Sequence, residues 1–157
     1  MNQEFESDKE LYDNGYYQDK LKQGVEFQDY ITEVLYKYGI ILVAYSSKHY
    51  QNSRGENMLG AEIKRDGKFR ETGNLYIEVS EKSDPRNPTY IPSGINRGDN
   101  SWLYIIGDEK TIFIFSIKFL KMLENKYQKV IKTTSNGFLL PLEDAKKYSI
   151  REIEINQ

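Results

Sequence analysis

The chain has 157 residues and a formal net charge of -2, with 38% apolar and 29% charged residues, which predicts one globular domain with a polar surface. It has no cysteine and a single histidine, His49, so disulfides, thiolate metal sites and sites with several histidine ligands are excluded. No apolar run is long enough to span a membrane, and the acidic N-terminus carries no apolar segment typical of a secretory signal. We therefore expect a cytoplasmic protein without membrane contact.

The first third of the chain predicts a helix followed by a strand. Residues 1–20 are acidic and polar, and we expect them to form an N-terminal extension. In residues 24–38, apolar side chains recur at the spacing of one helix face, and Gly39 follows as a stop signal. The run IILVAYS, residues 40–46, is almost entirely apolar and rich in β-forming residues, which predicts a strand buried on both faces.

Two strands joined by a glycine-containing turn are predicted over residues 60–66 and 75–82. We expect them to pair antiparallel and to share one sheet with residues 40–46. Two more β-rich runs, at 102–106 and 111–117, surround the turn sequence GDEK, and a helix is expected after them. The order of elements predicts an α/β fold, with a single mixed β-sheet flanked by helices.

The charged residues inside the two central strands define a candidate site. Because successive side chains of a strand point to opposite faces, Glu62 and Lys64 share one face of the first strand, and Glu78 and Lys82 share one face of the second. Carboxylates brought together on neighbouring strands repel one another unless a cation lies between them, and oxygen ligands suit Mg²⁺ or Mn²⁺. A solvated hairpin face with cross-strand ion pairs is the alternative that the pattern leaves open.

The segments that carry these residues are similar to a known family. GEN, GAEIKRD, TGNLYIE and SGI followed by WLYIIGD resemble the PD-(D/E)XK nuclease superfamily, in particular the small nucleases of phages and mobile elements. The resemblance covers about residues 24–123, the expected core, and leaves 124–157 as a C-terminal extension. It implies a restriction-endonuclease-like core of αβββαβ type. It also implies an endonuclease or exonuclease that hydrolyses DNA phosphodiester bonds with Mg²⁺ or Mn²⁺ as cofactor.

Carried over by position, the resemblance implies that Glu62 and Glu78 are the two metal-binding acids, and we expect their carboxylates to lie roughly 4 to 8 Å apart. The family's lysine usually stands two residues after the second acid, where this chain has Ser80. Lys64 and Lys82 are therefore the two candidates for the catalytic lysine. A regular antiparallel hairpin would bring Lys64 nearer to both carboxylates, so we expect Lys64 to be the catalytic lysine and Lys82 to be second.

A further acid often completes the site in this family. Glu26, on the predicted helix, is the matching candidate for a catalytic acid. Glu56, in the polar loop before the first charged strand, is the alternative and a candidate metal ligand.

Basic residues in the loops around the charged strands are expected to contact DNA phosphates, which set affinity but not sequence preference. They are Lys48, Arg54, Arg86 and Arg97. For each one alone, a solvated surface charge is the simpler interpretation.

A second hypothesis belongs to a different class of protein. The chain could be a catalytically degenerate protein of nuclease fold that binds DNA or inhibits a host protein partner. Ser80 at the usual lysine position and the net charge of -2 favour this hypothesis, and the two retained acids oppose it. A homodimer is compatible with either function.

Overall fold

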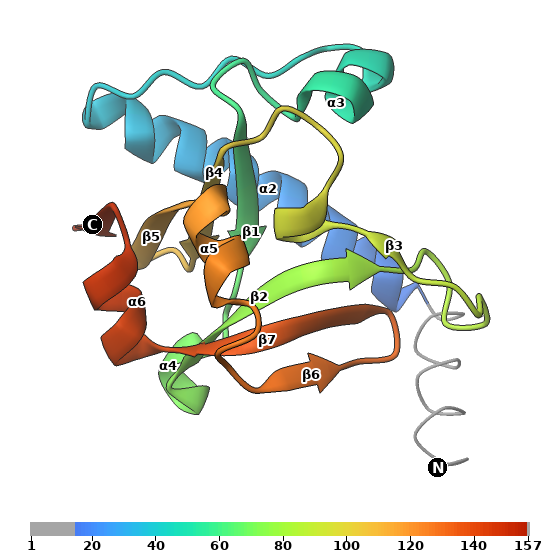
Figure 1. The fold of residues 1–157 in the computed structure, drawn as a ribbon. Helices are drawn as coiled ribbons and strands as arrows, with labels where there is room; N and C mark the ends of the chain where they lie inside the picture. Colours follow the sequence, from blue (N-terminus) through green and yellow to red (C-terminus); the bar gives the residue numbers. More distant parts are fainter. Residues whose placement is uncertain (1–14, 157) are drawn as a thin grey trace.

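The structure is a computed structural model that describes residues 15–156 (Figure 1). Most of the expected N-terminal extension, residues 1–14, lies outside the described residues. Residues 16–20 form the beginning of helix α2 (Tyr16–Lys37), which therefore starts before the predicted residue 24. The inner face of α2 is the predicted apolar stripe, because Phe27, Ile31 and Leu35 are all buried.

A mixed four-stranded sheet packs against α2 (Figure 1). Its strand order is β1-β4-β5-β8, with β1 parallel to β4 and the other pairs antiparallel. The strands are β1 (Ala61–Arg65), β4 (Leu103–Gly107), β5 (Thr111–Ser116) and β8 (Arg151–Glu154). Ala61 and Ile63 of β1 share one apolar core with α2. Because side chains alternate along a strand, residues 62 and 64 of this edge strand point away from α2.

An antiparallel four-stranded sheet, with the order β3-β2-β7-β6, forms the lower layer in Figure 1. Its strands are β2 (Asn74–Glu81), β3 (Ile91–Pro92), β6 (Lys129–Ile131) and β7 (Ser135–Pro141). A second apolar core joins Ile77 of this sheet with Tyr104 of the first sheet and with residues of two helices. These helices are α5 (Ile117–Leu123) and α6 (Leu142–Tyr148).

The remaining helical elements of the described residues are short. They are α3 (Lys48–Arg54), α4 (Phe69–Thr72) and the 3₁₀ helix η1 (Gly94–Asn96). Among the described residues, no helix is long and apolar enough to cross a lipid bilayer.

The α/β class is confirmed, but the expected single mixed sheet is wrong, because the strands form two separate sheets. The predicted strand at residues 40–46 is also wrong. Only Ala44 forms an isolated bridge there, with Asn57. Leu42 is buried, whereas Ile41 and Val43 are exposed, so this apolar run packs through one face and its strand pairing is confined to that single bridge.

The expected antiparallel pairing of residues 60–66 with residues 75–82 is wrong as well. β1 pairs with β4, and β2 pairs with β7. The residues between β1 and β2 form α4, which buries Phe69 in the core, so the chain does not fold straight back on itself. Residues 124–157, expected as a C-terminal extension, supply β6 and β7 to one sheet and β8 to the other.

Candidate active site

Lys64 of β1 lies between two carboxylates that come from different sheets. Its Nζ is 3.1 Å from Oε1 of Glu62 and 3.3 Å from Oε1 of Glu78. Glu62 and Lys64 point toward the second sheet because Ala61 and Ile63, the alternate residues of β1, face α2. One ammonium group therefore bridges both acids. The sum of its two distances is an upper limit for the separation of these oxygens, and this limit is below about 8 Å.

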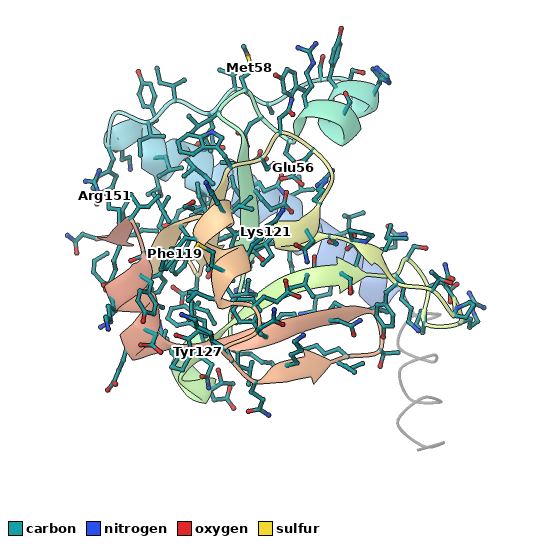
Figure 2. All side chains as sticks on the ribbon, viewed as in Figure 1. Glu56, Met58, Phe119, Lys121, Tyr127 and Arg151 are labelled. Atoms are coloured by element: carbon teal, nitrogen blue, oxygen red, sulfur yellow. The ribbon has the colours of Figure 1, made fainter. Side chains whose placement is uncertain are left out.

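Arg97 connects the same site to two further acids. Its Nη1 is 3.4 Å from Oε2 of Glu62 and 3.3 Å from Oε1 of Glu56, and its Nε is 3.0 Å from Oδ2 of Asp99. Glu56 lies between β1 and the loop that leads into β4 (Figure 2). The other oxygen of Glu56 accepts a hydrogen bond of 3.1 Å from Nε2 of Gln28 on α2. The cluster thus joins α2, β1, β2 and two loops.

The position of Glu78 depends on the turn at η1. Oγ of Ser93 donates a hydrogen bond of 2.6 Å to Oε1 of Glu78. A Cβ atom at Gly94 would overlap the carbonyl oxygen of Glu78, and Gly94 has a φ of 51°, a conformation that favours glycine. Glycine at this position therefore lets the SGI segment dock on β2 and fix the carboxylate.

The charged groups of the site are largely withdrawn from water. Glu62 is only 1% exposed. Burial, and then the charge of Glu62, raise the pKa of Glu56 to about 7. Burial alone would lower the pKa of Lys64, but the charges of Glu62 and Glu78 outweigh it and raise that pKa well above its ordinary value. The Tyr104 hydroxyl is fully buried beside these groups, and burial raises its pKa.

Four carboxylates and two cations make up the acidic cluster, which consists of Glu56, Glu62, Glu78, Asp99, Lys64 and Arg97. Carboxylate oxygens and a serine hydroxyl, without sulfur or imidazole, fit a hard divalent cation such as Mg²⁺ or Mn²⁺. In the described part of the chain, no group of three or more acidic, histidine or cysteine side chains stands ready to hold a metal ion. Lys64 and Arg97 lie between the carboxylates, so a metal ion would have to replace one of these cations.

The expected shared face of Glu78 and Lys82 is wrong, because β2 contains a bulge. Glu78 pairs with Gly137, whereas Ser80 pairs with Asn136, so β2 has one extra residue at this point. Neighbouring residues of β7 point to opposite faces of the sheet. Residues of β2 beyond the bulge therefore point to the face opposite to the one that the regular alternation from Glu78 would give them. The ammonium of Lys82 lies outside the acidic cluster, on an aromatic ring of the loop that follows β2.

Of the two candidates for a further acid, the structure brings Glu56 into the cluster and leaves Glu26 outside it. Glu26 lies on the exposed side of α2, where its Oε1 is 3.8 Å from Nζ of Lys22. The neighbouring Phe27 occupies the inner face of this helix turn.

The four basic residues expected to contact DNA have different surroundings. Arg97 belongs to the acidic cluster. Nε of Arg86 is 2.8 Å from Oδ1 of Asp84 in the same loop. The guanidinium of Arg54 lies 5.4 Å from the centroid of a tyrosine ring in α3. The backbone of Lys48 begins α3, and its side chain lies outside the part of the structure that is described.

Four residues of the site were not predicted as members of it: Gln28, Ser93, Asp99 and Tyr104. A signal existed for Ser93, because it precedes a glycine in the long loop, where a tight turn can dock. Gln28 and Tyr104 interact with residues that are distant in sequence, so no local pattern marks them. Asp99 pairs with Arg97, two residues before it, but the sequence does not show that this loop reaches the site.

No protein-family model, curated protein or solved structure compared with this chain matches it. The fold and the geometry of the acidic cluster are therefore the basis for proposing a function.

Proposed function

We propose that this chain is a divalent-metal-dependent nuclease that hydrolyses phosphodiester bonds of DNA. The observation that carries the proposal is the ammonium of Lys64, which lies within 3.3 Å of carboxylate oxygens of both Glu62 and Glu78. Metal-assisted phosphodiester hydrolysis needs acidic side chains that bind the metal ion. It also needs a positively charged group that stabilises the negative charge developing on the phosphate. The similarity of these segments to the PD-(D/E)XK superfamily supports the same proposal.

The burial of the cluster favours a functional role over a purely structural one. A buried ion pair contributes little to stability, and apolar residues of similar volume often do as well or better. Glu62 is 1% exposed, and the pKa of Glu56 is raised to about 7 by burial and then by Glu62. Perturbed ionisable groups that share one site are typical of catalytic centres.

Each residue of the central cluster has a distinct role in the proposed reaction. Glu62 and Glu78, with Glu56 beside them, would hold the metal ion. A bound Mg²⁺ or Mn²⁺ supplies polarisation of the phosphate and a more acidic water molecule. Lys64 donates hydrogen bonds to phosphate oxygens, where negative charge develops, and Ser93 keeps the Glu78 carboxylate oriented. Hydrolysis adds water across one P–O bond and leaves one phosphate end and one hydroxyl end.

Arg97 and Glu56 add a second pair of roles. Arg97 forms ion pairs with Glu56 and with Glu62, and Glu62 is also paired with Lys64. Once its acids carry another cation, the guanidinium is free to bind a phosphate through two donors. Glu56, with a pKa of about 7, can take up or release a proton near neutral pH.

The second candidate function is binding of DNA or a host protein without cleavage. It is favoured by the way Lys64 and Arg97 already neutralise the acids, and by the absence of a ready metal-binding group among residues 15–156. A protein that binds a metal ion in its folded state gains stability from it, so its melting temperature rises with metal concentration. A binding module without a metal site does not show this rise.

The test is incubation of the purified protein with plasmid, linear, single-stranded and branched DNA in Mg²⁺, Mn²⁺ or EDTA. The nuclease proposal predicts cleavage of at least one substrate with metal and none in EDTA. Glu62→Gln and Glu78→Gln should abolish cleavage, whereas Glu26→Gln, the same change on the exposed side of α2, should preserve it. No cleavage, combined with no metal-induced rise in melting temperature, would support the binding function instead.

A further inference from the structure

The ring of Tyr76 lies on the second sheet, two residues before Glu78 and on the same face of β2. A Cβ atom at Gly137 of β7 would be 2.8 and 2.9 Å from ring atoms of Tyr76, so the absence of a side chain there makes room for the ring. The Tyr76 hydroxyl is 3.0 Å from Oγ of Ser135. The β7 backbone and this hydrogen bond hold the ring in place.

Lys132 covers the same tyrosine ring. Its Nζ is 3.6 Å from the ring centroid of Tyr76, a cation–π contact. Partial burial lowers the pKa of Lys132, and the charges of Asp66, Lys68 and Glu78 also act on it. None of the ion pairs found in residues 15–156 involves Lys132. The Tyr76 ring therefore positions the Lys132 ammonium, and no carboxylate contact in the described residues neutralises its charge.

We propose that Lys132, held on the ring of Tyr76, binds the DNA phosphate that neighbours the scissile one. The inference deepens the proposed function and rests on it. Residues two apart on a strand are separated by about 7 Å, which is comparable to the spacing of successive phosphates in an extended nucleic-acid strand. A strand that places one phosphate at Lys64 and Glu78 therefore carries the next one over Tyr76 toward Lys132.

The pairing of a lysine with an aromatic ring fits a nucleic-acid strand in particular. Proteins that bind single strands combine positive groups that contact the backbone with aromatic rings on which bases stack. Lys132 and Tyr76 supply these two elements side by side, a positive group and an aromatic ring. An anion without bases would use the lysine alone.

Lys129 provides a matched control on the same strand. It pairs with Phe138, which is buried in the core, whereas its neighbour Val130 pairs with Gly137 under the Tyr76 ring. Because side chains alternate, Lys129 lies on the opposite face of the sheet from the proposed contact. Lys129 and Lys132 are both exposed, so replacing either one by glutamine removes the same charge from the surface.

The test is fluorescence anisotropy of a labelled single-stranded oligonucleotide, titrated with the protein in EDTA and in Ca²⁺ over a series of salt concentrations. Lys132→Gln should weaken binding about five- to tenfold and reduce the slope of log K against log salt by about 0.7, the share of one phosphate contact. Lys129→Gln should bind within about twofold of the wild type. Tyr76→Leu should resemble Lys132→Gln, and Tyr76→Phe, which keeps the ring, should resemble the wild type. Thermal denaturation of each variant checks that the fold is intact.

The outcomes separate this inference from the proposed function. If Lys132→Gln and Lys129→Gln bind alike, with equal salt slopes, or if the wild type binds no oligonucleotide in either buffer, the proposed contact does not exist. If the wild type cleaves DNA and Lys132→Gln does so with unchanged KM, the nuclease function stands and this inference is wrong. If Lys132→Gln loses affinity while the wild type cleaves nothing, the phosphate contact stands and the nuclease function is wrong.

Discussion

Nη1 of Arg97 lies 3.4 Å from Oε2 of Glu62, a residue that is only 1% exposed to solvent. Arg97 belongs to the loop before β4 and Glu62 belongs to the edge strand β1, so this ion pair connects the loop to the sheet. A buried carboxylate that loses its partner costs more stability than the intact pair contributes. The stability of the fold is therefore coupled to a cation at the position where the proposed function requires metal binding.

Arg97→Gln should lower the free energy of unfolding by about 2 kcal/mol, less than for a fully buried pair because the Arg97 side chain is 27% exposed. Mg²⁺ or Mn²⁺ should recover part of this loss, since a divalent cation can neutralise the same acids. Urea denaturation with and without metal measures both effects. Arg54→Gln, at an exposed site on α3, is the control. Equal stability of the two variants would show that Arg97 does not compensate the buried acids.

Glu56 predicts a specific dependence of stability on pH. Burial, and then Glu62, raise its pKa from an ordinary 4.5 to about 7, so between these values the folded state keeps a proton that the unfolded chain has lost. The contribution is fully present below pH 4.5 and is lost as the pH rises to about 7. The free energy of unfolding should fall over this range by up to about 1.4 kcal/mol per pH unit.

Glu56→Gln carries no titrating group at this position and should flatten that dependence, whereas Glu26→Gln should keep the wild-type slope. Chemical denaturation at several pH values measures it. Identical slopes for the wild type and Glu56→Gln would show that Glu56 titrates as an ordinary exposed carboxyl.

Lys64 and Lys82 are distinguished by the bulge in β2. Lys64→Met should abolish cleavage, because its ammonium contacts both Glu62 and Glu78. Lys82→Met should cleave DNA at a rate within about threefold of the wild-type rate, because the bulge directs Lys82 to the opposite face of the sheet from Glu78. Cleavage rates under single-turnover conditions, at matched thermal stability, test this difference. A greater loss in Lys82→Met would contradict the assignment.

Gly94→Ala should disturb the fold and the site together. An alanine Cβ would overlap the Glu78 carbonyl oxygen and would require a φ near 51°, which costs a residue with a side chain about 2 kcal/mol. Gly98→Ala is the control, because nothing lies within 4 Å of its added Cβ. Thermal denaturation and cleavage rates are the measurements. A Gly94→Ala variant as stable and active as Gly98→Ala would show that the docking of η1 on β2 does not position the Glu78 carboxylate.

Part of the site could be predicted from the sequence because it depends on local alternation. Glu62 and Lys64 share a face of β1 by the two-residue period of a strand, and this period does not depend on which strand pairs with β1. The same rule failed for Lys82, because a bulge adds one residue to β2 and no local signal marks it.

The strand pairing and the rest of the site depend on contacts that are distant in sequence. β1 finds its partner in β4 and β2 finds its partner in β7, choices that are made by the two apolar cores and not by the turn between β1 and β2. Arg97 and Glu56 are both loop residues, and their meeting with Glu62 follows from how the loops close over the edge of the first sheet.

The central claim is that the Glu62–Lys64–Glu78 cluster hydrolyses DNA with a divalent metal, and a cleavage time course on an end-labelled oligonucleotide tests it most directly. Wild-type protein and Glu26→Gln should form labelled products in Mg²⁺ or Mn²⁺ and none in EDTA, whereas Glu62→Gln, folded by the criterion of its melting curve, should form none in any buffer. Product formation by Glu62→Gln at the wild-type rate, or in EDTA, would contradict the claim.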